Sequence, residues 1–130
     1  MKLYQGIDIV EVGKFRKILL RNDNFIADIF TGQEREYCLS RKDPYIHFAG
    51  RFAVKEASMK ALGIGFSGPG IDYAFLEIET LPNASGKPVL SFSGWVGKIS
   101  GKQRINQLTV SISHSTNYAV ASVILVGTQH

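Results

Sequence analysis

The sequence is poor in several features that would assign a protein to a class. A single cysteine, Cys38, cannot form a disulfide within the chain, which is typical of proteins from a reducing compartment. The longest apolar stretch, residues 118–126, is far shorter than the roughly 20 residues that a membrane-spanning helix needs. The first five residues lack the apolar run of a secretory signal. We therefore expect a cytoplasmic protein.

Two common functional signatures are also missing. None of the three histidines lies near another histidine or a cysteine at the spacing of metal ligands, which argues against a zinc site. The segment Asn83–Pro88 carries a glycine and a lysine but lacks the first glycine and the Ser or Thr of a P-loop, so binding of a nucleoside triphosphate is not indicated. Cys38 lies in an expected amphipathic helix, and we predict that it packs in the interior and is not a nucleophile.

What the sequence does contain is typical of a folded protein with basic character. Apolar residues make up 45% of the chain and charged residues 20%, and 130 residues suffice for one domain, residues 1–130. The net charge is +4 and the pI is about 9.3. A basic surface of this kind can attract nucleic acid, a membrane surface or an acidic protein. The alternative is that the basic residues only form the solvated face of a helix. Four of the cations lie in a segment without acids: Lys14, Arg16, Lys17 and Arg21.

Apolar periodicity and capping signals predict an α+β protein. A strand over residues 4–10 precedes a helix over 11–20 that Asn22 should end. Thr31 and Glu34 form a capping box for a helix to Leu39, and Asp43-Pro44 begins a long helix that runs to about Leu62. The remaining elements are a loop at 66–70, strands at 74–80 and 89–93 joined by a turn, a weak helix over 94–102, and a hairpin of strands at 108–113 and 118–126. This order predicts a small antiparallel sheet packed on the long helix.

Two carboxylates are candidates for a metal site. Asp8 lies in an apolar strand, where an unpaired charge is costly unless it meets a cation or donors; the alternative is a cap for the next helix. Glu56 lies one helical turn before Lys60, and the alternative there is an ordinary i,i+4 ion pair. Asp8 and Glu56 together would suffice for Mg2+, which completes its octahedron with water and phosphate oxygens.

His114 and the Gly86-Lys87-Pro88 loop complete the candidate site. His114 follows an apolar strand, where it would donate to a phosphate or carry a proton; the alternative is a histidine that only bonds backbone. Two separated carboxylates, a lysine, a histidine and a glycine loop can together hold a metal ion against a phosphorylated ligand.

These segments together resemble the holo-[acyl-carrier-protein] synthases, the short bacterial 4'-phosphopantetheinyl transferases. The most specific stretch is residues 48–61, Phe-Ala-Gly-Arg-Phe-Ala-x-Lys-Glu-Ala-x-x-Lys-Ala. The other matching stretches occur in the family's order and lie at residues 6–12, 30–34 with Tyr37, 83–88, and 110–114 with 118–119. The resemblance spans nearly the whole chain.

The resemblance implies an enzyme of fatty acid biosynthesis that transfers phosphopantetheine from coenzyme A to a serine of acyl carrier protein and releases adenosine 3',5'-bisphosphate. By position, Asp8 and Glu56 match magnesium ligands, and Glu56 or a metal-bound water would take the serine proton. Lys60 matches a lysine on the coenzyme A phosphates. The residues that match those lining the nucleotide end of coenzyme A are Gly86, Lys87, Pro88 and His114. Arg51 is expected to contact the 3'-phosphate.

The same resemblance suggests partners. Lys14, Lys17 and Arg21 would form a docking face for the acidic carrier protein. The family usually forms a homotrimer with active sites between subunits, and the apolar residues on both faces of 120–126 are compatible with burial against a neighbour. Two alternatives remain, a nucleic-acid-binding domain and a metal-dependent phosphohydrolase. The first leaves Asp8 and Glu56 unexplained, so we expect no nucleic acid as partner. The short apolar stretch at 118–126 leads us to expect no membrane as partner either.

Overall fold

The structure is a computed structural model that describes residues 1–65 and 71–129. The loop expected at 66–70 and the terminal His130 lie outside these residues. Among the described helices, none has the combination of length and hydropathy that a membrane crossing requires. The α+β fold predicted from the sequence is confirmed.

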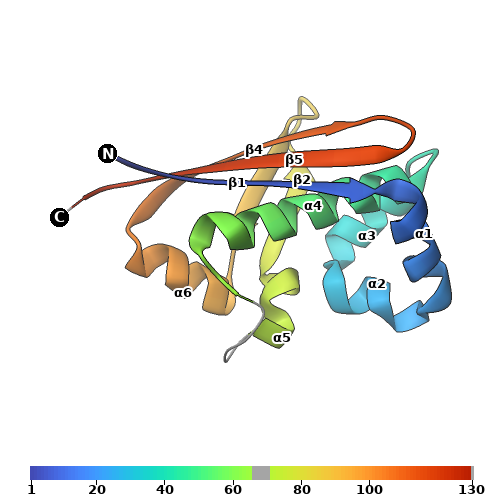
Figure 1. Ribbon diagram of the computed structural model, residues 1–130, viewed down its shortest axis with the longest axis horizontal. Coiled ribbons are helices and arrows are strands. Elements are labelled where there is room, and N and C mark those ends of the chain that lie inside the picture. Colours follow the sequence, from blue (N-terminus) through green and yellow to red (C-terminus); the bar gives the residue numbers. More distant parts are fainter. Residues whose placement is uncertain (66–70, 130) are drawn as a thin grey trace.

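A long helix, α4 (Pro44–Leu62), lies at the centre of the molecule (Figure 1). It begins as predicted, because Asp43 Oδ1 accepts a hydrogen bond from the backbone N–H of Tyr45 and Pro44 needs no donor in the first turn. It ends where Gly63 adopts the left-handed conformation at φ 74°. Small residues keep its interior face narrow, and Ala49, Ala53 and Ala57 are fully buried. The sheet can therefore lie close to the helix axis.

An antiparallel sheet of three strands covers one side of α4 (Figure 1). Its order is β1 (Lys2–Glu11), β5 (Tyr118–Gly127) and β4 (Ile105–His114), and the last two form the predicted hairpin. Gly6 lies where β1 crosses the helix, and a Cβ atom built there would be 1.8 Å from the carbonyl oxygen of Ala57. Only glycine permits this contact between two backbones, which brings Asp8 against α4.

Three short helices pack at the N-terminal end of α4 (Figure 1): α1 (Val12–Arg21), α2 (Asp23–Ile29) and α3 (Gly32–Leu39). The capping box of Thr31 and Glu34 is present and starts α3 as predicted. Helix α2 was not expected, because the polar run at residues 22–24 reads as the end of a helix. The chain does leave the helical conformation at Asn22, but it starts a new helix at the next residue.

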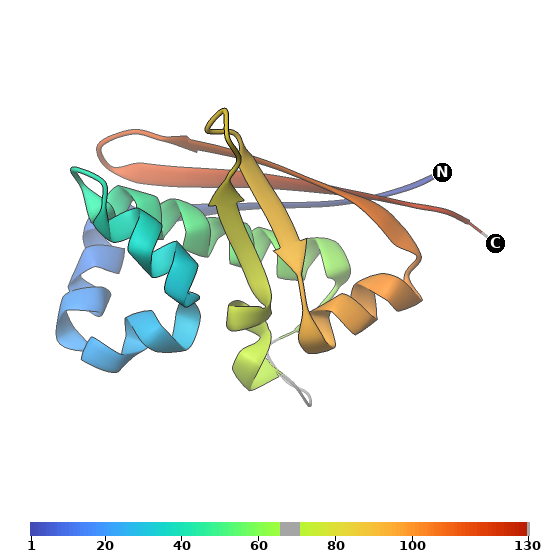
Figure 2. The same ribbon diagram turned by 180° about the vertical axis from the view of Figure 1, so that it is seen from behind.

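A second, two-stranded sheet crosses α4 on the side away from β1 (Figure 2). It consists of β2 (Ile78–Pro82) and β3 (Pro88–Phe92), joined by the predicted turn. The strand expected at 74–80 is wrong in its first half, which instead forms a short helix, α5 (Ile71–Ala74), and a 3-10 turn (Phe75–Glu77). The carbonyls of Phe75 and Ile78 both accept hydrogen bonds from Lys55, and this shared donor bends the segment around the ammonium.

Helix α6 (Gly94–Lys102) forms although its glycines predicted a weak helix. The Glu77 carboxylate accepts hydrogen bonds from the backbone N–H groups of Trp95 and Val96, at 3.0 and 3.2 Å. This tertiary contact satisfies donors that a helix N-terminus leaves free. Gly94, at φ 55°, leaves the room that the carboxylate occupies.

A buried ion pair joins α3 and the second sheet to α4. Lys55 Nζ lies 2.7 Å from Glu34 Oε1, and both side chains are fully buried. Glu34 Oε2 also accepts the backbone N–H of Thr80 at 3.0 Å. Burial lowers the pKa of Lys55, while the Glu34 carboxylate opposes that change. Because the Glu34 carboxylate bonds both α4 and β2, it holds in place the strand from which the loop at 83–88 projects.

Candidate active site

Lys60 on α4 bonds Asp8 on β1. Its Nζ donates to Asp8 Oδ1 at 3.0 Å and to the carbonyl of Ile7 at 3.1 Å. Neither alternative for these residues describes this arrangement. Lys60 pairs across to the strand and not with Glu56, and α1 begins at Val12 without a side-chain cap. The Asp8 side chain is 12% exposed and that of Lys60 is 56% exposed. The lysine therefore retains a solvent-facing side for a ligand.

Glu56 lies beside this pair. Asp8 and Glu56 line the same cavity of about 240 Å³, together with Lys14. Burial raises the pKa of the half-buried Glu56, and the negative charge of Asp8 raises it further, while Lys60 opposes the change. Because Lys60 bonds Asp8, the Glu56 carboxylate has no ion-pair partner of its own among the side chains that the structure describes.

The carboxylate pair fits a divalent cation with oxygen ligands. No group of three or more His, Cys, Asp or Glu side chains gathers among the residues that the structure describes. A metal ion at Asp8 and Glu56 would thus take its other ligands from water and from the oxygens of a bound molecule. This donor set suits Mg2+, which usually binds through one or two carboxylates plus phosphates.

A second cavity, of about 190 Å³, contains the unpaired cation Arg51. Arg51 is 5% exposed, its guanidinium lies 4.3 Å from the centre of the Tyr37 ring, and its Nε has no hydrogen-bond partner. Among the side chains that the structure describes, no carboxylate lies within ion-pair distance of Arg51, in contrast to the buried Lys55. A buried cation is costly without a counter-charge, so the cavity is suited to an anionic ligand.

Four of the predicted cofactor-binding residues line this cavity: Arg51, Gly86, Pro88 and His114. The loop that carries Gly86 is shaped by Asn83, whose Oδ1 accepts the backbone N–H groups of Ser85 and Lys87. Gly86 itself has φ 88°, a conformation that favours glycine. The Lys87 side chain is exposed and is not part of the cavity wall.

Two further residues of this cavity were missed from the sequence, Tyr37 and His47. His47 was assigned only to the long helix, where it does lie, one turn before Arg51. Its ring lies edge-on to Tyr37 and to His114, with ring centres 5.8 Å apart in both pairs. The i,i+4 spacing of His47 and Arg51 was the available signal.

The two groups of predicted site residues are separate within one chain. Asp8, Glu56 and Lys60 lie where β1 packs on α4, whereas Arg51 and His114 lie toward β4. The three cavities that these residues line in the described part of the chain do not combine members of both groups. Within one chain, the predicted residues therefore do not line a single cavity.

The predicted docking residues lie on α1. Lys17 and Arg21 are exposed. Lys14 is also exposed, with Nζ 3.5 Å from Glu11, an ion pair of little energetic weight at the surface. Arg16 instead lies over the ring of Tyr45, 5.1 Å from its centre. Cys38 is fully buried as predicted, and burial raises the pKa of its thiol to about 12.

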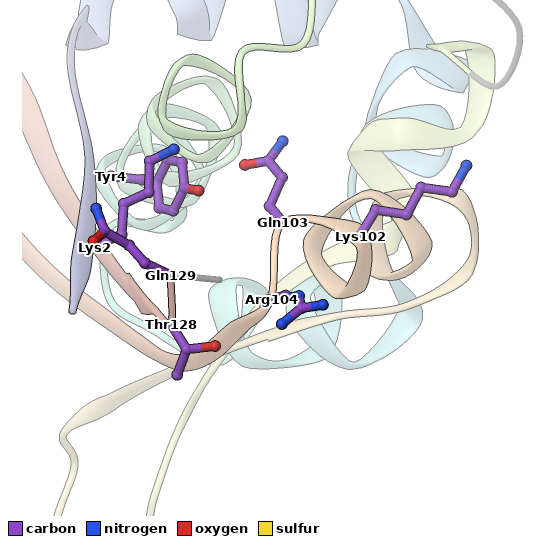
Figure 3. Close-up of a pocket in the computed structure, with 7 residues that line it drawn as sticks. All are labelled: Lys2, Tyr4, Lys102, Gln103, Arg104, Thr128 and Gln129. Atoms are coloured by element: carbon purple, nitrogen blue, oxygen red, sulfur yellow. The ribbon is translucent and has the colours of Figure 1, made fainter.

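Another cavity, of about 280 Å³, lies at the end of the molecule where the chain termini meet (Figure 3). The hydroxyl of Tyr4 and the amide of Gln103 face each other across it, with Lys2 beside Tyr4, while the Lys102 side chain extends away. None of the predicted site residues lines it. This cavity is distinct from both parts of the candidate site.

Comparison with known proteins assigns the chain to a family. A family model described as the 4'-phosphopantetheinyl transferase superfamily matches residues 5–123. A holo-[acyl-carrier-protein] synthase of Caldanaerobacter subterraneus is 37% identical over 127 residues, covering 98% of this chain and 97% of its own length. One from Syntrophus aciditrophicus is 42% identical, covering 94% of both chains. The chain therefore belongs to the 4'-phosphopantetheinyl transferase superfamily and, within it, to the holo-[acyl-carrier-protein] synthases.

Solved structures agree with this assignment. The Chronobacterium ammoniagenes ACPS–CoA complex is 30% identical, covers 99% of this chain and 100% of its own, and superposes with a TM-score of 0.86. The Helicobacter pylori holo-[acyl-carrier-protein] synthase in complex with coenzyme A is 31% identical, with 94% and 99% coverage and a TM-score of 0.78. The resemblance noted in the sequence is confirmed.

Proposed function

We propose that this protein transfers the 4'-phosphopantetheine group of coenzyme A to a serine of apo acyl carrier protein, as a cytoplasmic, single-domain enzyme of fatty acid biosynthesis. The observation that carries the proposal is the buried Arg51 without a counter-charge, in a cavity that His114 and Gly86 also line. The names of the relatives, and the coenzyme A in their solved complexes, support the same reaction.

The reaction is a displacement at phosphorus. The serine oxygen bonds to the β-phosphorus of coenzyme A, the bond from that phosphorus to the bridging oxygen breaks, and adenosine 3',5'-bisphosphate leaves. Arg51 and His114 bind the 3'-phosphate end, which anchors the leaving group. Lys60, held by Asp8 and the Ile7 carbonyl, presents its ammonium to the diphosphate. Positioning and charge neutralisation then supply most of the rate enhancement.

Asp8 and Glu56 would hold Mg2+, which supplies positive charge to the diphosphate oxygens when it is bound. Glu56 also accepts the proton of the serine hydroxyl, directly or through a water. In the absence of the cation, its half-buried position beside Asp8 raises its pKa. Asp8 in turn orients Lys60, so loss of Asp8 affects both charge and geometry.

We further propose that the enzyme is a homotrimer whose sites form between subunits. The separation of the Asp8 group from the Arg51 group supports this, because a neighbour would supply the group that each site lacks. Exposed apolar side chains on the outer face of the sheet offer the surface for a second copy: Leu3, Ile7 and Ile9 of β1, and Tyr118 and Ile124 of β5. Mixing inactive Asp8→Ala and Arg51→Ala proteins should restore activity if sites are shared, and should restore none if each chain works alone.

The exposed cations of α1 are proposed as the docking face for the acidic carrier protein. Charge complementarity mainly raises the association rate and is screened by salt. Doubling the ionic strength should therefore raise the KM for acyl carrier protein, and Lys17→Glu with Arg21→Glu should do so at low salt. Lys98→Glu, an exposed change on α6, is the matched control. An unchanged KM in both experiments would remove the docking proposal.

The decisive test incubates the protein with coenzyme A, Mg2+ and apo acyl carrier protein and weighs the carrier. A gain of one phosphopantetheinyl group is expected, and it should be lost with Asp8→Ala, Glu56→Ala or a chelator. Cleavage of coenzyme A without the carrier would favour the phosphohydrolase instead. Retention of RNA or DNA on a filter at physiological salt would favour the nucleic-acid-binding alternative.

A further inference from the structure

The Arg51 cavity contains a second histidine. His47 and His114 come from different elements, α4 and β4, yet their rings meet edge-on with centres 5.8 Å apart. Tyr37 of α3 makes the same contact with the other side of His47 and also lies beneath the Arg51 guanidinium. Rings on both sides limit the positions open to the half-buried imidazole of His47, which remains part of the cavity wall.

The surroundings of His47 are predominantly positive. Arg51 of the same helix, Arg41 before that helix, and His114 of β4 all oppose its protonation, and burial contributes most. Asp43 is the acidic group that acts in the other direction, and Tyr37 is the remaining titratable neighbour. These influences lower the pKa of His47 below its ordinary value of 6.5, so the imidazole is neutral at pH 7 in the free protein.

We propose that His47 is a recognition residue for the phosphate monoester bound by Arg51 and His114, and that it takes up a proton when this dianion enters the cavity. The inference rests on the proposed function and adds a residue and a proton to it. The dianion neutralises the cations that oppose protonation, and the imidazolium then donates a charge-assisted hydrogen bond to it. Compared with a variant that cannot be protonated at position 47, the protein should therefore bind this ligand increasingly well as the pH falls toward 6.

The test compares adenosine 3',5'-bisphosphate binding to the full-length protein and to His47→Phe. Phenylalanine keeps the ring contacts with Tyr37 and His114 but cannot be protonated. Titration calorimetry in two buffers of different ionisation enthalpy measures the protons taken up. Because the ligand phosphate titrates in both experiments, the difference between the two proteins reports on His47. Thermal melting shows that the variant is folded.

The wild-type protein should take up more protons than His47→Phe near pH 7, and at pH 6 it should bind the bisphosphate several-fold more tightly than His47→Phe does. Adenosine 5'-monophosphate, which lacks the 3'-phosphate, should show neither difference. Equal proton uptake and equal pH dependence in both proteins would overturn the role of His47 while leaving the proposed function intact. If neither protein binds the bisphosphate, the Arg51 cavity is not the nucleotide site, and both proposals fail.

Discussion

Replacing Arg51 by methionine should make the free protein more stable and its ligand binding weaker. Methionine retains the long apolar stem but removes a charge that is 95% shielded from water, since Arg51 is only 5% exposed. A buried donor without a partner, here Nε, costs about 1–3 kcal/mol. The stacking on Tyr37 at 4.3 Å returns about 1 kcal/mol, which the variant loses. The expected net gain is about 1 kcal/mol, or roughly 4 °C in Tm.

The same substitution should weaken ligand binding. A hydrogen bond to a charged group contributes about 1.5–3 kcal/mol, so adenosine 3',5'-bisphosphate should bind roughly 10- to 100-fold more weakly to Arg51→Met. Calorimetric melting measures the first effect, and titration calorimetry or the KM for coenzyme A measures the second.

Arg35 provides the matched control. Its Nε is also buried without a partner, but the residue lies on α3 and lines none of the cavities described above. Arg35→Met should change stability without changing ligand affinity. A lower Tm together with unchanged affinity in Arg51→Met would refute the argument that this arginine is kept for an anion.

Three other predictions concern the frame of the site. Lys55→Met leaves the Glu34 carboxylate buried without its ammonium and should lower the free energy of unfolding, measured in urea, by about 3–5 kcal/mol. The double variant that also carries Glu34→Leu should recover much of this loss. No recovery would contradict the pairing. Gly6→Ala forces a methyl group toward the Ala57 carbonyl, so it should lower the free energy of unfolding by about 1–3 kcal/mol and reduce activity. Gly13 has open space around it, so Gly13→Ala should lower neither. The thiol of Cys38, with its pKa raised to about 12, should react with a disulfide reagent at pH 8 only after unfolding; rapid labelling of the native protein would show that the site is accessible.

The parts of the fold that were predictable are those in which local signals decide. The capping box of Thr31 and the Asp43-Pro44 start of α4 involve residues within one helical turn, and both are present as expected. The errors arise where a distant group decides. Lys55 bends residues 75–77 away from a strand, and Glu77 stabilises a glycine-rich helix that its own composition disfavours. Neither contact leaves a pattern in the sequence.

The candidate site shows the same division. Helical spacing put Glu56 within reach of Lys60, but it could not show that Lys60 bonds the strand, because that depends on how closely β1 approaches α4. The involvement of His47 was missed for a similar reason: its partner His114 is 67 positions away in the chain, and only the fold brings the rings together.

The contact at Gly6 has a consequence for any attempt to redesign this protein. The obstacle to a larger residue there is a main-chain carbonyl, which every amino acid at position 57 possesses. No compensating truncation on the helix can therefore make room for a larger residue at position 6. Varying that position should tune the separation of Asp8 from Lys60 without altering a single reactive group.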